Sequence, residues 1–207
     1  MRVLDLTVLS ATPLQRDPYE HLVVPGFLRP EAVEAVTRDF PLITKPGLFP
    51  LSALQSGPAF RAFIDELDGT EFESAISDSF GLTLAGKPKM FTVRGRCHPR
   101  DGRIHTDSTT KVVSILAYLN PGWEKDGGRL RVLRSATDLS DFATEIPPVA
   151  GTLFAFRRSE RSFHGHEPFD GARRAIQMNW MTTTANRDRE LARHRLSAGL
   201  KRLNPFC

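Results

Sequence analysis

Residues 105–120 read HTDSTTKVVSILAYLN, and this stretch decides the fold. Its second half, Val112 to Leu119, is a nearly continuous run of apolar and β-branched residues, which predicts a buried strand. Its first half places His105 and Asp107 two residues apart, so their side chains point to the same side of an extended backbone. The stretch therefore predicts an imidazole and a carboxylate that converge beside a strand.

Short β-rich runs separated by Gly, Pro and Asp lie on both sides of this stretch. Helical periodicity is confined to the N-terminal part, after Pro30 and between Pro58 and Phe80, where Asp68-Gly69 interrupts it. The pattern predicts helices packed on a β-sandwich or jelly roll, an α+β fold that is mainly β. The expected strands are residues 21–24, 90–93, 112–119, 130–133, 152–156 and 175–181.

The composition excludes several classes of protein. The chain has 207 residues, of which 40% are hydrophobic, so one domain with a sizeable core is expected rather than a disordered or fibrous chain. The longest apolar run is far too short to span a membrane, and the two cysteines, Cys97 and Cys207, cannot build a disulfide framework. We therefore expect a cytoplasmic protein without a membrane partner.

The excess of basic over acidic residues is confined to one segment near the C-terminus. Lys and Arg outnumber Asp and Glu by 28 to 24, but residues 187–202 alone hold six basic residues against two acidic ones. The rest of the chain is balanced, so its charge does not favour a nucleic-acid partner. We expect residues 185–207 to form a basic helical tail that ends at Pro205.

A second histidine completes a candidate metal site. His164 follows the expected strand 152–156, and an antiparallel jelly roll can bring it beside His105 and Asp107. Two neutral imidazoles and one carboxylate leave coordination positions open, as in non-haem Fe(II) oxygenases. His166 shares the strand parity of His164, so it is an alternative third ligand.

Arg173 and Arg174 open the last expected strand. An inward-facing guanidinium can hold a carboxylate by two parallel hydrogen bonds. Because side chains alternate along a strand, only one of the two arginines can face inward. The other is then an exposed charge.

The ordered string of these residues resembles the prolyl-hydroxylase-like branch of the Fe(II)/2-oxoglutarate-dependent oxygenases, particularly the oxygen-sensing prolyl hydroxylases. The resemblance covers about Met90 to Trp180. The peptide-gripping regions of that subgroup do not match, so prolyl specificity does not follow. The matching residues are His105, Asp107, Tyr118 to Asn120, Trp123, Gly127 to Arg131, Phe154, Phe156, His164, Pro168, Arg174 and Trp180.

The resemblance implies a double-stranded β-helix core over residues 86–184, with residues 1–85 as a helical support, in one oxygenase domain of residues 1–207. It implies His105, Asp107 and His164 as iron ligands, and Pro168 selects His164 over His166. The spacing to Trp180 selects Arg174 over Arg173 for the far carboxylate of 2-oxoglutarate, with Tyr118 as its second partner.

Three further residues are expected at the substrate opening. Lys111 and Trp180 fall where the subgroup borders it. Arg94 stands where the subgroup has a tyrosine near the metal, which suggests an anionic substrate or a second carboxylate.

The resemblance implies a hydroxylase with no catalytic residue beyond the metal ligands. Its cofactors would be Fe(II), 2-oxoglutarate and dioxygen, with ascorbate as a further candidate, and its substrate a small molecule or a peptide. Oxidative decarboxylation of 2-oxoglutarate to succinate and carbon dioxide would be coupled to hydroxylation of a C–H bond. Two alternatives stay open: a metal-binding jelly roll without oxygenase activity, which could hold zinc, and an interaction module that uses the basic tail. Oligomeric state cannot be read from the sequence.

Overall fold

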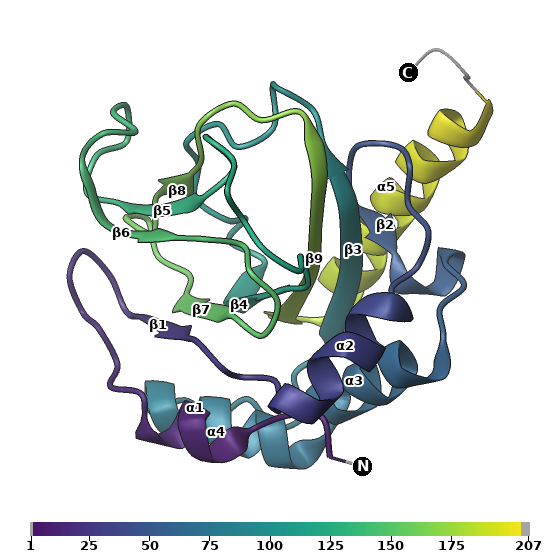
Figure 1. Cartoon of the computed structure of the whole chain (residues 1–207). Helices are drawn as coiled ribbons and strands as arrows, with labels where there is room; N and C mark the ends of the chain where they lie inside the picture. The colour runs from purple at the N-terminus through teal and green to yellow at the C-terminus, as the bar shows by residue number, and fades with distance from the viewer. Residues whose placement is uncertain (1, 204–207) are drawn as a thin grey trace.

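The computed structural model describes residues 2–203, with side chains up to Gly199 (Figure 1). Two antiparallel sheets face each other. The larger has the order β1-β7-β4-β9-β3-β2 and the smaller β6-β5-β8. The chain is mainly β, and the predicted double-stranded β-helix with flanking helices is confirmed. The expected tail beyond Leu203, including Pro205 and Cys207, lies outside the described residues.

The strands have the following bounds: β1 His21–Val24, β2 Phe49–Pro50, β3 Lys89–Cys97, β4 Lys111–Tyr118, β5 Leu130–Leu133, β6 Phe142–Ile146, β7 Leu153–Arg157, β8 His164–Gly165 and β9 Gly171–Met181. The helices are α1 Leu6–Ala11, α2 Pro30–Arg38, the 3-10 turn η1 Leu51–Ala53, α3 Pro58–Asp68, α4 Thr70–Phe80 and α5 Thr184–Leu203. The six predicted strands are present, whereas β2, β6, β8 and α1 were not predicted.

The helices α1 to α4 pack on one face of the larger sheet (Figure 1). The periodic stretch from Pro58 to Phe80 forms two helices because the chain bends at Gly69, whose extended backbone ends α3 and precedes α4. Each helix buries one apolar stripe, as the 3.6-residue period requires. The buried side chains are Phe60, Phe63, Ile64 and Leu67 of α3, and Phe72, Ile76 and Phe80 of α4.

Because side chains alternate along each strand, one face of the larger sheet packs against the helices and the other faces the smaller sheet. In β4, Val113, Ile115 and Ala117 belong to the helix-packed core, while Leu116 and Tyr118 face the smaller sheet. The same alternation runs along β7 and β9. One face therefore carries the main core, and the other faces a cavity between the two sheets.

The C-terminal helix α5 lies beside β2 and β3 at the edge of the larger sheet (Figure 1). It follows β9 directly and crosses toward the open side of the cavity. No helix within residues 2–203 is both long and apolar enough to cross a lipid bilayer.

Candidate metal centre and cosubstrate pocket

His105 and His164 come from segments far apart in the sequence and are joined by their backbones. The N–H of each donates to the carbonyl of the other, over 3.1 Å and 3.0 Å. This bridge brings the imidazole rings to a centroid distance of 4.4 Å. Asp107 follows in the loop before β4, and one ligand atom each from His105, Asp107 and His164 lies within 4.8 Å of the others.

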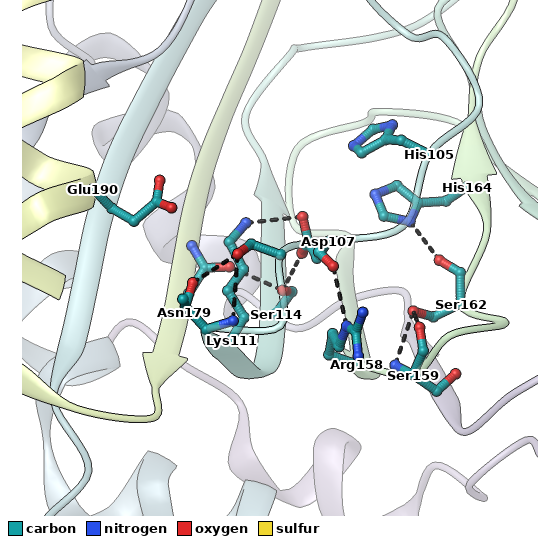
Figure 2. Close-up of polar contacts among 12 residues, drawn as sticks. His105, Asp107, Lys111, Ser114, Arg158, Ser159, Ser162, His164, Asn179 and Glu190 are labelled. Carbon is teal, nitrogen blue, oxygen red and sulfur yellow. Dashed lines mark hydrogen bonds and ion pairs between the residues drawn. The ribbon is translucent and has the colours of Figure 1, made fainter. Parts of the chain in front are cut away.

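Both imidazoles are oriented for coordination. Nδ1 of His105 lies 2.8 Å from the carbonyl oxygen of Arg103, and Nδ1 of His164 lies 3.0 Å from that of Ser162. Since a carbonyl only accepts, each Nδ1 carries the proton and each Nε2 keeps its lone pair. Figure 2 shows the Nδ1 bond of His164 to Ser162. The donor set therefore fits a divalent metal with open positions.

The charge states also fit a metal. Burial lowers the pKa of His164 to about 4, so this ring is neutral at pH 7. Burial by itself would raise the pKa of Asp107, but the Lys111 charge, the protonated form of His164 at low pH, and the hydrogen bonds from Lys111 and Ser114 outweigh it and lower that pKa to about 2. Asp107 is therefore an ionised carboxylate inside the protein.

Neighbouring side chains hold the Asp107 carboxylate in place (Figure 2). Lys111 Nζ lies 2.8 Å from Oδ1, and the Ser114 hydroxyl donates to Oδ2. Ser114 is in turn 2.9 Å from the amide oxygen of Asn179 on β9. Arg158 donates from Nε to the Asp107 carbonyl over 3.1 Å.

The three ligand residues line a cavity of about 320 Å³ between the two sheets. Its walls come from β3, β4, β5, β8, β9 and the loop before β4, and α5 closes one side. The polar and charged residues that line it include Arg94, His105, Asp107, Lys111, His164, His166, Arg173, Gln177, Glu190, Arg193 and His194.

Arg173, and not Arg174, faces this cavity. The Arg173 side chain donates from Nε to the Gly128 carbonyl over 2.7 Å and from Nη2 to the Tyr118 hydroxyl over 3.4 Å. The residue is 3% exposed, and its guanidinium lies 5.2 Å from the centroid of the Tyr118 ring. Among the described residues, the hydrogen-bond partners of Arg173 are neutral, so a ligand carboxylate would supply the balancing charge.

The selection of Arg174 was wrong. Its side chain points to the helix-packed face, where Nη1 donates to the Thr37 carbonyl over 3.3 Å and the guanidinium lies 5.5 Å from the centroid of the Phe40 ring. The error came from Trp180, which lies seven residues after Arg173 and therefore on the opposite face of β9.

Trp180 is likewise not at the substrate opening. It is fully buried in the helix-packed core and stacks on Phe72 at a centroid distance of 6.0 Å. Tyr118 is also fully buried, behind Arg173 and outside the residues that line the cavity. Burial raises the pKa of the Tyr118 hydroxyl, so it stays neutral and supports the guanidinium.

The other predicted residues do line the cavity. Arg94 forms an ion pair of 2.5 Å with Asp101, and Lys111 pairs with Asp107. His166 lines the cavity too, but it is not in the His105, Asp107 and His164 cluster that the described residues form. Burial and the nearby charge of Arg173 lower the pKa of His166 to about 4.

Sequence reasoning did not find which residues hydrogen-bond to Asp107, nor the part of the cavity wall that α5 supplies. Ser114 could have been found, because it shares strand parity with Tyr118 and so faces the same side of β4. Glu190, Arg193 and His194 recur at helical spacing on one face of α5, but nothing in the sequence says that this face meets the cavity.

Comparison with known proteins agrees with this geometry. Residues 95–182 match the model of the 2OG-Fe(II) oxygenase superfamily, and the matched segment contains the three candidate ligands and Arg173. No curated protein sequence matches the chain.

Several solved structures share the fold. A prolyl-4-hydroxylase from Pseudomonas putida is 21% identical, with a TM-score of 0.52 over 85% of this chain and 90% of that one. A prolyl 4-hydroxylase from Phytophthora capsici is 18% identical, with a TM-score of 0.57 over 90% of this chain and 68% of that one. HygX from Streptomyces hygroscopicus, solved with nickel and 2-oxoglutarate bound, is 15% identical, with a TM-score of 0.51 over 86% of each chain.

Residues 95–182, which carry the candidate site, belong to the 2OG-Fe(II) oxygenase superfamily, in agreement with the predicted class of Fe(II)/2-oxoglutarate-dependent dioxygenases. The predicted cofactors of this class, Fe(II), 2-oxoglutarate and dioxygen, are confirmed.

Proposed function

We propose that the protein is an Fe(II)/2-oxoglutarate-dependent dioxygenase, a hydroxylase whose iron is held by His105, Asp107 and His164 and whose 2-oxoglutarate is held by Arg173. The observation that carries the proposal is one cavity that joins three converging ligand atoms to a buried guanidinium with neutral partners. Bound iron and 2-oxoglutarate supply oxidative decarboxylation to succinate and carbon dioxide, coupled to hydroxylation of a substrate C–H bond.

The chain's own residues then bind, orient and shield the reactants. Asp107 and the two imidazoles are oriented by their hydrogen bonds to Ser114 and to the carbonyls of Arg103 and Ser162 before any metal arrives. Tyr118 and the Gly128 carbonyl keep the Arg173 guanidinium in place. No side chain needs to act as an acid or base, so no catalytic residue beyond the ligands is proposed.

The substrate is a small molecule or a side chain of a peptide. We propose a cytoplasmic location because the chain has two cysteines, and we retain ascorbate as a candidate reductant. We also propose that the chain is one oxygenase domain, because its helices pack directly on the larger sheet.

The test is anaerobic absorption spectroscopy of metal-free protein titrated with Fe(II) and then 2-oxoglutarate. We expect a weak visible metal-to-ligand charge-transfer band in the wild-type chain. Arg173→Leu should weaken 2-oxoglutarate binding at least about tenfold, because it removes a charge-assisted hydrogen-bond pair. Its neighbour Arg174→Leu is the matched control and should bind as the wild type does.

The ligand assignment is tested by Asp107→Ala and His164→Ala, which should bind no iron in the titrated range. Iron-loaded, folded wild-type protein without the band would contradict the proposed site. Loss of the band in Arg174→Leu with retention in Arg173→Leu would reverse the arginine assignment.

A further inference from the structure

Among the described residues, four cationic side chains line the cavity, and three of them keep a partner when the proposed metal and cosubstrate are bound. Arg94 pairs with Asp101, which lies outside the metal cluster. Arg193 pairs with Glu190 on α5. Arg173 is the proposed partner of the 2-oxoglutarate carboxylate. The fourth cation is Lys111.

Lys111 differs because its partner is itself a candidate metal ligand. Its ammonium lies 2.8 Å from Oδ1 of Asp107, and its side chain is 11% exposed. A divalent metal on Asp107 draws on the same negative charge and repels the ammonium at short range. Metal binding therefore weakens the interaction that balances the Lys111 charge.

A displaced ammonium at this position needs a new anion. A side chain with 11% exposure cannot regain full hydration, and a buried charge without a partner is strongly unfavourable. The cavity wall also contains Gln177 and Met90 on the strands, which carry no charge, and Glu190 on α5, which is acidic. Figure 2 shows Glu190 on the same side of the site as Lys111 and Asn179.

Glu190 is the competing partner within the protein. Its side chain is 13% exposed and its carboxylate is already paired with Arg193. To bind Lys111 it would have to leave or share that guanidinium. An acidic group on an incoming molecule needs no such exchange.

The size of the cavity limits what that molecule is. About 320 Å³ is at the small end of the range for ligand pockets, and 2-oxoglutarate occupies part of it. The part of the substrate that enters is therefore compact.

We propose that the substrate is a small carboxylic acid whose carboxylate is bound by Lys111 after the metal has bound to Asp107. This inference rests on the proposed function and adds the substrate class. It also favours an order of binding, because a metal on Asp107 leaves Lys111 with less negative charge beside it and so strengthens its attraction for an incoming anion.

The first experiment measures metal affinity, with Ni(II) as a redox-inert probe. Lys111→Met should bind Ni(II) about tenfold more tightly than the wild type, because it removes a cation that competes for Asp107. Lys111→Arg keeps the charge and should bind as the wild type does. Lys89→Met is the matched control, because Lys89 is 13% exposed and ion-paired with Glu73 at 3.2 Å, outside the cavity.

The second experiment measures succinate release from the iron-loaded full chain in the presence of small acids, each beside its own primary amide. The probes are L-proline, L-leucine, L-lysine, butyrate and benzoate. At least one acid should raise succinate release at least about tenfold more than its amide, the scale of one charge-assisted contact. Lys111→Met should lose that preference, while Lys111→Arg and Lys89→Met should keep it.

The inference is overturned if no acid exceeds its amide in the wild-type chain, or if Lys111→Met keeps the preference. It is also overturned if Ni(II) binds Lys111→Met no more tightly than the wild type. If Glu190→Gln alone abolishes the acid preference, Glu190 is part of the recognition site and Lys111 is not the anchor. The charge-transfer band distinguishes failure of the proposed function from failure of this inference. Absence of the band in the wild type rejects the proposed function, whereas its presence without an acid preference rejects only the proposed substrate class.

Discussion

At the scale of single residues, the hydroxyl of Ser114 sets the position of the Asp107 carboxylate. It donates to Oδ2 and is itself held near Asn179. Ser114→Ala should weaken Ni(II) binding about tenfold, the lower end of the effect of removing a partner of a metal ligand. The matched control is Ser140→Ala, because Ser140 donates to an exposed carboxylate, that of Asp138, over 2.7 Å.

Calorimetric titration of the metal-free variants measures this difference. The two neighbours of Asp107 then act in opposite directions: loss of Ser114 loosens the metal and loss of Lys111 tightens it. Equal affinities of Ser114→Ala and wild type would show that the carboxylate is positioned by other contacts.

At the scale of elements, β9 shows where sequence reasoning works and where it stops. Alternation correctly separates Arg173 and Gln177 from Arg174 and Trp180. It cannot say which group faces the cavity, because both faces of the sheet are covered and both are buried. A β-bulge opposite Gly95 adds one residue to β9 at Arg173 and Arg174, and further weakens any count from neighbouring positions.

The convergence of the three candidate ligands was predictable for a physical reason that did not apply to the arginine. His105 and Asp107 are close in sequence, so their convergence is local, and His164 needed only an antiparallel pairing. The two-residue strands β2 and β8 and the mostly half-buried β6 carry too little local pattern to be predicted. They exist because the partner strands are already in place.

The helix α5 is predicted to shape the substrate end of the cavity and to leave the metal end intact. Ala198 is its buried apolar residue among the side chains described, while Glu190 and Arg193 line the cavity. A chain that ends at Thr183 should therefore bind 2-oxoglutarate within about threefold of the intact chain, the scale of a surface change. The charge-transfer titration measures this.

Two further results complete the test of α5. Glu190→Ala/Arg193→Ala in the full chain removes the same wall without shortening the protein, and should also bind 2-oxoglutarate normally. Loss of cosubstrate binding in both proteins would mean that α5 supports the core, and would contradict a division of the cavity into two ends.

At the scale of the whole molecule, stability and chemistry lie on opposite faces of one sheet. The main core, with Trp180 and Phe72, fills the helix side, whereas the cavity side carries buried polar groups. Buried ionisable groups make that side a source of pH sensitivity. The buried ionisable groups of the site are therefore expected to lower the stability of the fold in acid solution.

The metal-free chain should lose stability as the pH falls from 6.5 toward 4. Burial lowers the pKa of both His164 and His166 to about 4, whereas both titrate near 6.5 when unfolded. Between these values the unfolded state binds more protons than the folded state, so the free energy of unfolding falls as the pH falls.

Each histidine should lower the free energy of unfolding by about 2 kcal/mol between pH 7 and pH 5. Urea unfolding at the two pH values measures the loss, and His166→Gln should show about half of it. An equal loss in His166→Gln would place the pH sensitivity in other groups.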